Sequence, residues 1–262
     1  MGLFAPKCPL SLDEWEWQLA CFKWLLEEFG GLEQHRRSDL VLPNADFFPP
    51  TGAQSEDFVA EILDQIKSHC GMAEWPTRLV IGEAGKAMDI GTVQHLVHDR
   101  HANLGEFRVV EDGSGGYVAE IAYNPDLATR PSKLIATLSH ELGHYLLSGA
   151  KKCPPGGRDI EEHATDLATV YMGFGIFLAN DARSFSGHSQ GWQTEWQGYL
   201  SETALITALT ISETLAGRDP MEAAPHLKSY LAKDLSKAVK FCRDRNLIEE
   251  IMAVDLTEYG VK

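Results

Sequence analysis

The chain has 262 residues, of which 44% are hydrophobic, a content that suits a buried core and excludes a disordered or fibrous protein. Its formal net charge of −15 argues against a nucleic-acid groove, because phosphate binding needs clustered Lys and Arg. The five cysteines are irregularly spaced, so we expect reduced thiols rather than a disulfide framework.

Targeting and membrane signals are also missing from the sequence pattern. No stretch approaches the ~20 consecutive apolar residues of a membrane span, and the first residues lack a basic region followed by an apolar run. Pro6 stands where a myristoylation pattern requires Ser or Thr. We therefore expect a cytoplasmic protein that binds neither nucleic acid nor membrane.

The beginning of the chain has a helical pattern. Ser11 and Glu14 form a capping-box pattern that starts a helix, and the pair Gly30-Gly31 ends it. A second helix is predicted from Ser55 to near Gly71, because its apolar residues recur at helical spacing. The intervening stretch, rich in proline, is the one internal seam that the sequence suggests.

The hydrophobic period then changes to that of strands. Short runs at 78–81, 107–110 and 117–123 have the composition of strands. The turn from Asp112 to Gly116 is rich in glycine, so the last two runs are predicted to form a hairpin. Residues 82–106 give no clear prediction.

A helix is predicted between Pro131 and Gly149, where proline suits the first turn and glycine suits the end. On a helical wheel, His140 and His144 lie one turn apart and nearly opposite a broad apolar stripe. Two imidazoles in this arrangement can share one tetrahedral metal ion, with Glu141 displaced toward the open coordination position. The stripe consists of Leu134, Ile135, Leu138, Leu142, Tyr145 and Leu146.

A further helix is predicted from about Asp159 to Leu178, after a Pro-Pro-Gly-Gly loop at 154–157 that lets the chain reverse. Glu162 and Asp166 are four residues apart and share a face with Thr169 and Gly173. The small residues on that face would permit close approach of another helix. A His-Glu-x-x-His pattern alone arises by chance often enough to be only suggestive, and the downstream Glu and Asp strengthen it.

The segments His140-Glu141-Leu142-Gly143-His144 and Glu162-His163-Ala164-Thr165-Asp166 together resemble the gluzincin branch of the zincin metallopeptidases. The resemblance covers roughly residues 107–178. It implies that His140, His144 and Glu162 bind zinc, that Glu141 is the general base, and that Asp166 orients a zinc-bound histidine. It also implies a sheet whose edge strand aligns the substrate, which would put residues 117–123 beside the cleft.

These roles give a hydrolytic mechanism. Three protein ligands leave zinc a position for water, whose pKa falls toward ~7, and Glu141 then takes a proton and later delivers it to the leaving amine. Tyr171, His188 and Tyr199 are candidates for stabilising the oxyanion, and the sequence assigns this role to none of them.

Several alternatives remain open at the level of sequence. The two histidines could be polar residues on an exposed helix face, and Glu162 could serve only a capping box with Asp159. Glu161 is an alternative ligand, Asp166 could be an ordinary surface acid, and manganese or another divalent ion could replace zinc.

Other candidate features lie outside this core. His95, His98 and His101 recur every third residue and could hold a second metal, although a solvated face explains them more simply. Trp192 and Trp196 could form a substrate rim, although aromatic residues at helical spacing more often belong to the core. The amphipathic stretches 200–215 and 227–242 could pack on the core or bind a protein partner.

We therefore expect an α+β fold, in which a small twisted sheet packs against two metal-site helices and helices from both termini flank them. Residues 1–50 would form an N-terminal helix and extended segment, 51–180 the metal-binding core, and 181–262 a helical part packed on the core. The expected function is that of a peptidase with one zinc ion per chain that acts on a peptide or protein substrate. The alternative is a catalytically silent metal-binding module that acts through protein interaction.

Overall fold

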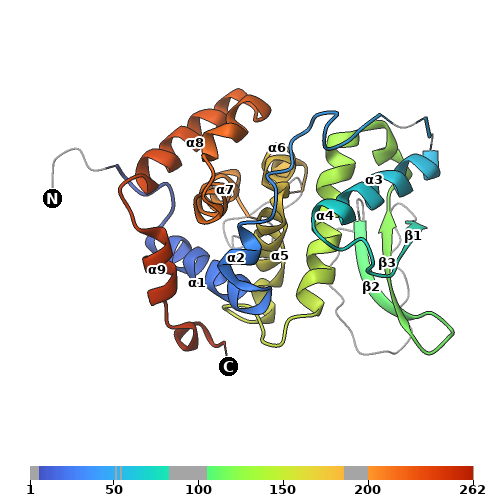
Figure 1. Cartoon of the computed structure of the whole chain (residues 1–262), viewed down its shortest axis with the longest axis horizontal. Helices are drawn as coiled ribbons and strands as arrows, with labels where there is room; N and C mark the ends of the chain where they lie inside the picture. The colour runs from blue at the N-terminus through green and yellow to red at the C-terminus, as the bar shows by residue number, and fades with distance from the viewer. Residues whose placement is uncertain (1–5, 51, 54, 83–104, 186–199, 262) are drawn as a thin grey trace, which may run out of the picture. The chain divides into compact units, whose positions relative to one another are not determined.

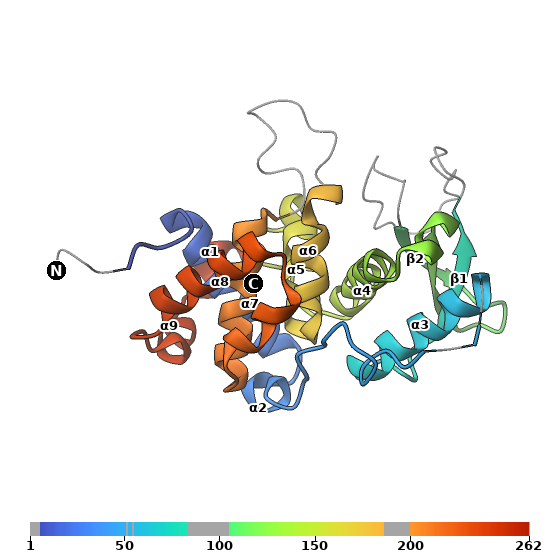
Figure 2. The same cartoon turned by 90° about the horizontal axis from the view of Figure 1, so that it is seen from above.

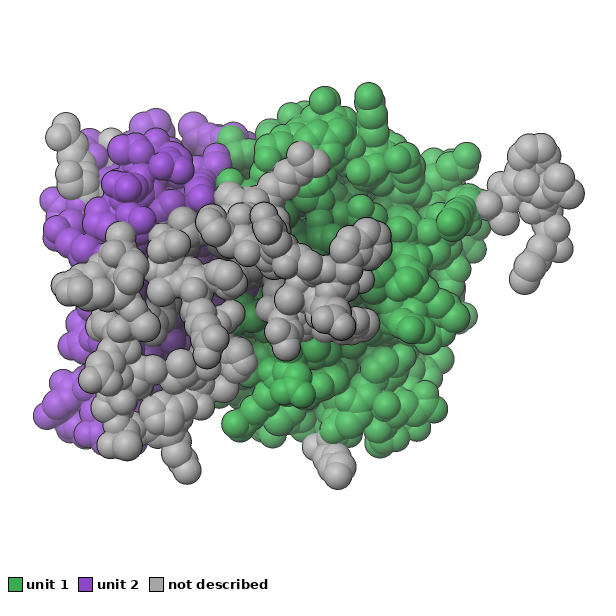
Figure 3. Space-filling model, turned by 180° about the vertical axis from the view of Figure 1, so that it is seen from behind, with its two compact units in different colours: residues 1–43, 146–262 green, residues 44–145 purple. Residues whose placement is uncertain are grey.

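The computed structural model describes residues 6–50, 52–53, 55–82, 105–185 and 200–261. Within these ranges the fold is α+β, as expected, with many helices and one small sheet (Figure 1). The chain divides into two compact units, which Figure 3 colours separately. Unit 1 combines Met1–Pro43 with Leu146–Lys262, and unit 2 is Asn44–Tyr145. These boundaries differ from the three consecutive segments that we expected, because both ends of the chain contribute to one core.

Unit 2 contains a three-stranded sheet of β1 (Thr77–Ile81), β2 (Gly105–Glu111) and β3 (Tyr117–Tyr123) in the order β1-β3-β2. β3 is parallel to β1 and antiparallel to β2, which confirms the predicted hairpin. The Asp112 carboxylate closes its turn by accepting hydrogen bonds from the backbone N–H groups of Ser114 and Gly116. Since β3 is the central strand, the expectation that residues 117–123 offer a free edge to substrate is wrong.

Two helices of unit 2 cover one face of this sheet, namely α3 (Ser55–His69) and α4 (Pro131–Ser148), and Figures 1 and 2 show them on the same side. The Lys67 ammonium of α3 donates to the Thr77 hydroxyl over 3.0 Å. From α4, the Tyr145 ring lies 5.5 Å from that of Phe107 on β2. Both helices therefore pack on the sheet face that carries Thr77 and Phe107, and a 3₁₀ turn, η1 (Pro125–Thr129), leads from β3 into α4.

Unit 1 is built of helices around α7 (Glu202–Ala216), which is buried along nearly its whole length. A helix that is apolar on all sides needs neighbours all round, and α7 contacts six other helices of this unit. The surrounding helices are α1 (Leu12–Glu28), α2 (Gly31–His35), α5 (Glu161–Thr169), α6 (Gly175–Phe185), α8 (Ser229–Cys242) and α9 (Leu247–Ala253). The shorter 3₁₀ turns are η2 (Arg158–Ile160), η4 (Pro220–His226) and η5 (Leu256–Tyr259).

Helix starts in unit 1 follow the sequence signals. Ser11 and Glu14 form both hydrogen bonds of the predicted capping box at the start of α1. Ser201 caps α7, and Gly217, at φ 77°, ends it in the left-handed conformation. The apolar side of α8, with Leu231 and Leu235 fully buried, packs into the core of unit 1.

The predicted single helix over 159–178 is interrupted. A π-helical turn, η3 (Val170–Phe174), separates α5 from α6, and Gly173 has φ 98° inside it. The segment that follows α2 packs there, because the Val41 N–H donates to the Gly173 carbonyl over 3.1 Å. A Cβ atom on residue 173 would lie 2.2 Å from the Asp39 carbonyl oxygen. The close approach predicted at this glycine is thus made by an extended segment and not by a helix.

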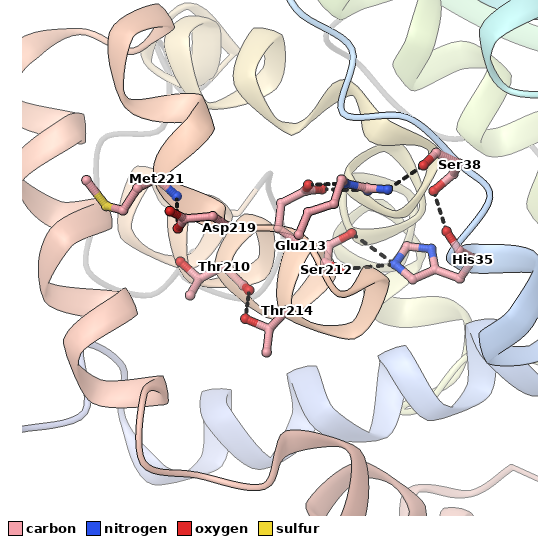
Figure 4. A network of polar contacts seen from close by, with 9 residues as sticks. His35, Ser38, Thr210, Ser212, Glu213, Thr214, Asp219 and Met221 are labelled. Atoms are coloured by element: carbon pink, nitrogen blue, oxygen red, sulfur yellow. Dashed lines mark hydrogen bonds and ion pairs between the residues drawn. The ribbon is translucent and has the colours of Figure 1, made fainter.

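A buried polar network ties this segment to the end of α7 (Figure 4). His35 Nε2 lies 3.1 Å from the Ser212 carbonyl oxygen, and the imidazole stacks on the Tyr171 ring at 4.3 Å. Arg218 pairs with the fully buried Glu213 over 2.6 Å and also donates to the Ser38 carbonyl. A buried carboxylate requires such a partner, so Arg218 fixes the turn after α2 against α7.

Two further expectations concern the whole chain. All five cysteines are free, as predicted. Among the helices of the described residues, none combines the length and the apolar character that crossing a bilayer demands.

Candidate metal centre

Helix α4 carries the two histidines of the motif. It starts at Pro131 and continues without a break to Ser148, the residue before Gly149, as predicted. His140 and His144 therefore lie one turn apart, and their ring centroids are 4.9 Å apart with planes nearly perpendicular at 85°. Both imidazoles project from the same side of the helix, where they can reach one ion.

Most of α4 up to the motif is buried. Residues 134–143 are all buried, so the predicted apolar stripe is covered up to Leu142, whereas Tyr145 and Leu146 are partly exposed. On the histidine side, His140 is only 2% exposed and His144 is partly exposed, and Glu141 is 6% exposed. The alternative of two polar residues on an exposed helix face is therefore wrong for His140.

Glu162 lies in the first turn of α5. The N-cap of this helix is Ile160, no side chain caps it, and Asp159 belongs to the preceding turn η2. The alternative in which Asp159 and Glu162 form a capping box is therefore not what the structure has. Glu161, the alternative ligand, is buried next to it.

His140, His144 and Glu162 form a group that could hold a metal ion. One ligand atom from each residue lies within 4.8 Å of the other two. In a tetrahedral zinc site with bonds of about 2.05 Å, ligand atoms are about 3.3 Å apart, so a small contraction around an ion suffices. Within the described parts of the chain, this is the one such group of three or more His, Cys, Asp or Glu residues. Two imidazoles and one carboxylate are a donor set that suits zinc and other divalent transition metals.

Phe107 of unit 2 lies beside His144 in an aromatic cluster that also contains Tyr145 and Trp75. The Phe107 ring of β2 is nearly parallel to the His144 ring, with an interplanar angle of 9° and centroids 6.3 Å apart. Tyr145 lies against Trp75 at 4.8 Å, and burial raises the pKa of its hydroxyl. The sequence predicted β2 as a strand, but a strand pattern does not tell which helix residue Phe107 meets.

Asp166 is buried on α5, one turn after Glu162, and its carboxylate accepts the Leu200 N–H over 2.7 Å. The alternative of a surface acid is therefore wrong. Its predicted role of orienting a zinc-bound histidine stays a prediction. His163, between these acids, has a pKa lowered by burial, an effect that the charges of Asp166 and Glu162 oppose.

Of the three candidates for stabilising the oxyanion, only Tyr171 lies within the described residues. The Tyr171 hydroxyl donates to the Phe29 carbonyl over 3.3 Å, and burial raises its pKa to about 12. Its hydrogen bond and its stacking on His35 give Tyr171 a structural role inside unit 1. The remaining candidates fall outside the described residues, namely His188, Tyr199, the rim residues Trp192 and Trp196, and the spaced histidines His95, His98 and His101.

Comparisons with known proteins give this chain no relative. No protein-family model, no curated protein and no solved structure matches it.

Proposed function

We propose that this protein is a zinc-dependent peptidase whose ion is held by His140, His144 and Glu162. The observation that carries the proposal is the convergence of these three donors, which come from two helices, within 4.8 Å of one another. The motif places Glu141 directly after the first ligand, and this carboxylate is buried on the same helix. A purely structural site would have no chemical need for an acid at this position.

The chain's own residues divide the work of hydrolysis. An ion in the site would lower the pKa of a coordinated water toward ~7 and polarise a carbonyl group. Glu141 accepts a proton from the attacking water and delivers it to the leaving amine, so one carboxylate serves both halves of the reaction. Because Glu141 is only 6% exposed, its electrostatic interactions are screened less by water than those of a surface carboxylate.

We further propose that an extended peptide is the substrate and that it pairs with β2. Both edges of β3 are already hydrogen-bonded, whereas in the described sheet β2 pairs with β3 alone. Phe107 of β2 lies beside His144. A peptide added to this strand would therefore run past the histidine pair, with its backbone aligned by hydrogen bonds.

The first test is the metal content of the purified protein. We expect about one zinc ion per chain in the wild type and a loss of that ion in His144→Ala. Glu162→Gln should weaken zinc binding, and Glu161→Gln is the matched control, since this neighbouring glutamate lies outside the group. No bound metal after zinc is added would contradict the proposal.

The second test separates catalysis from silent metal binding. Wild type and Glu141→Gln, both loaded with zinc, are incubated with a random synthetic peptide mixture, and the products are analysed by mass spectrometry. Cleavage by the wild type alone, with equal zinc content in both proteins, is the expected result. If the two zinc-loaded proteins leave the mixture equally intact, the alternative of a non-hydrolytic module is favoured.

A further inference from the structure

The turn that leads into α5 is braced from outside by α1. The indole N–H of Trp17 donates to the Pro155 carbonyl over 2.9 Å. The next residue, Gly156, has φ 88° and donates its N–H to the Tyr259 carbonyl over 2.9 Å. The loop 154–157 is therefore attached to two other elements of unit 1, α1 and η5.

Trp17 also contacts the first turn of α5 itself. Its ring meets the His163 ring edge to face, with centroids 6.1 Å apart and an interplanar angle of 75°. His163 is only 7% exposed, and the partly buried Trp17 packs against the core of unit 1 at this contact. One side chain of α1 thus touches the chain on both sides of Glu162.

These two contacts restrict how far the first turn of α5, which carries Glu162, can rotate or shift. Consecutive residues of an α-helix project about 100° apart, so the packing of His163 against Trp17 sets the direction of its neighbour Glu162. The hydrogen bond to Pro155 holds in place the loop from which the chain enters α5. α5 has no side-chain cap of its own, which leaves its start dependent on such outside contacts.

We propose that Trp17 is a positioning residue for the metal centre and holds the third ligand, Glu162, in the direction in which it reaches the ion. This inference rests on the proposed zinc site. It assigns a role in metal affinity to a residue that is 145 positions from Glu162 and that the motif does not contain. Partners that orient metal ligands typically contribute about 10- to 100-fold to metal affinity.

The test is a double-mutant cycle on zinc affinity, measured by competition with a chromogenic chelator. Trp17→Phe keeps an aromatic ring but removes the N–H donor, and we expect about 10-fold weaker zinc binding in the wild-type background. In a Glu162→Gln background the same substitution should have almost no further effect, because the ligand that it positions is already lost. Trp15→Phe is the control, since Trp15 is on the same helix and packs against Phe241 instead.

The outcomes are distinguishable. Equal weakening by Trp17→Phe in both backgrounds, or no weakening in either, would overturn the inference and leave the metal centre intact. Absence of zinc from the wild-type protein would overturn the proposed function itself. The visible spectrum of the cobalt-substituted protein adds a second readout, because a displaced carboxylate changes the coordination geometry in Trp17→Phe but not in Trp15→Phe.

A second pair of variants tests the same attachment by changing the loop 154–157 instead of Trp17. This pair is used if Trp17→Phe does not fold. A Cβ atom at Gly156 would lie 2.2 Å from Ile160 Cδ1, whereas at Gly157, with φ 76°, it would meet nothing within 4 Å. Both Gly156→Ala and Gly157→Ala strain the backbone, but only the first forces the side chain of Ile160, the N-cap of α5, to move. We expect weaker zinc binding in Gly156→Ala alone, and equal zinc affinities in the two variants would contradict the proposal.

Discussion

The Asp166 carboxylate accepts a hydrogen bond from the Leu200 N–H over 2.7 Å and so links α5 to the residues just before α7. Because Asp166 is only 1% exposed, its loss leaves a donor without its partner inside unit 1. We predict that Asp166→Ala lowers the free energy of unfolding of the metal-free protein by about 1–3 kcal/mol. Asp166→Asn keeps an acceptor oxygen and should lower it less, as urea unfolding in the presence of a chelator would measure. Equal losses in both variants would contradict this role of the carboxylate oxygen.

Zinc should stabilise the fold by mass action. An ion that binds only the folded state adds about 2.7 kcal/mol when its free concentration is 100 times its Kd. We predict a higher melting temperature with zinc than with chelator in the wild type, and no difference in His140→Ala. Since metal ligands bind in their deprotonated form, the zinc effect should be smaller at the lower pH. Thermal melts at pH 7.5 and pH 5.5 check both statements.

Gly173 should tolerate no side chain. At φ 98° an L residue is strained by about 1–2 kcal/mol, and its Cβ atom would also collide with the Asp39 carbonyl oxygen. Gly217, at φ 77° with nothing within 4 Å, is the matched control that isolates the backbone strain. We predict that Gly173→Ala lowers the free energy of unfolding by about 1–3 kcal/mol more than Gly217→Ala does. Similar midpoints of urea unfolding for the two variants would contradict this, because the segment that contains Asp39 would then move aside without lowering the free energy of unfolding.

His35 should make unit 1 sensitive to acid. Burial lowers the pKa of its imidazole from 6.5 to about 4, and the nearby Arg218 adds to this effect, although the hydrogen bond with the Ser212 carbonyl opposes it. The unfolded chain therefore binds a proton between pH 6.5 and 4 that the folded chain does not, and stability falls as the pH drops through this window. At pH 5 the loss from this group is about 2 kcal/mol relative to pH 7.5.

The comparison with His35→Gln isolates this contribution. Glutamine has an amide donor that can reach the Ser212 carbonyl, but it does not titrate. Urea unfolding of both proteins from pH 7.5 to pH 5 should show a smaller decline for the variant. Parallel curves would mean that His35 takes up its proton as readily in the folded state as in the unfolded one.

Local signals predicted the elements that they control directly. The capping box at Ser11, the hairpin turn at Asp112 and the helix from Pro131 were all predicted, because each depends on residues close together in the sequence. The parallel pairing of β1 with β3 was not, since it joins segments about 40 residues apart. The π-helical turn was missed because Gly173 fits a helical face, and only the approach of Asp39 explains its positive φ.

The candidate site likewise combines features that local sequence predicted with features that only tertiary contacts determine. The spacing of His140 and His144 gave their shared side of α4, and the convergence of Glu162 agrees with the ligand set that the resemblance implied. The sequence did not predict the neighbours of the site residues. Phe107 contacts His144, and Leu200 contacts Asp166, only through tertiary packing. Trp17 carries no local signal at all, since its partners Pro155 and His163 lie more than a hundred residues away along the chain.

The assembly of unit 1 from both ends of the chain has a consequence for biosynthesis. The Lys23 ammonium donates to the Met252 and Val254 carbonyls, 229 and 231 residues later. At ribosomal rates of about 5–20 residues per second, α1 waits roughly 10–50 s for these partners. Unit 2 is one continuous segment and can fold during that interval. The apolar side of α1, with Trp24 and Phe22, is therefore synthesised long before α9, which α1 contacts in the folded protein.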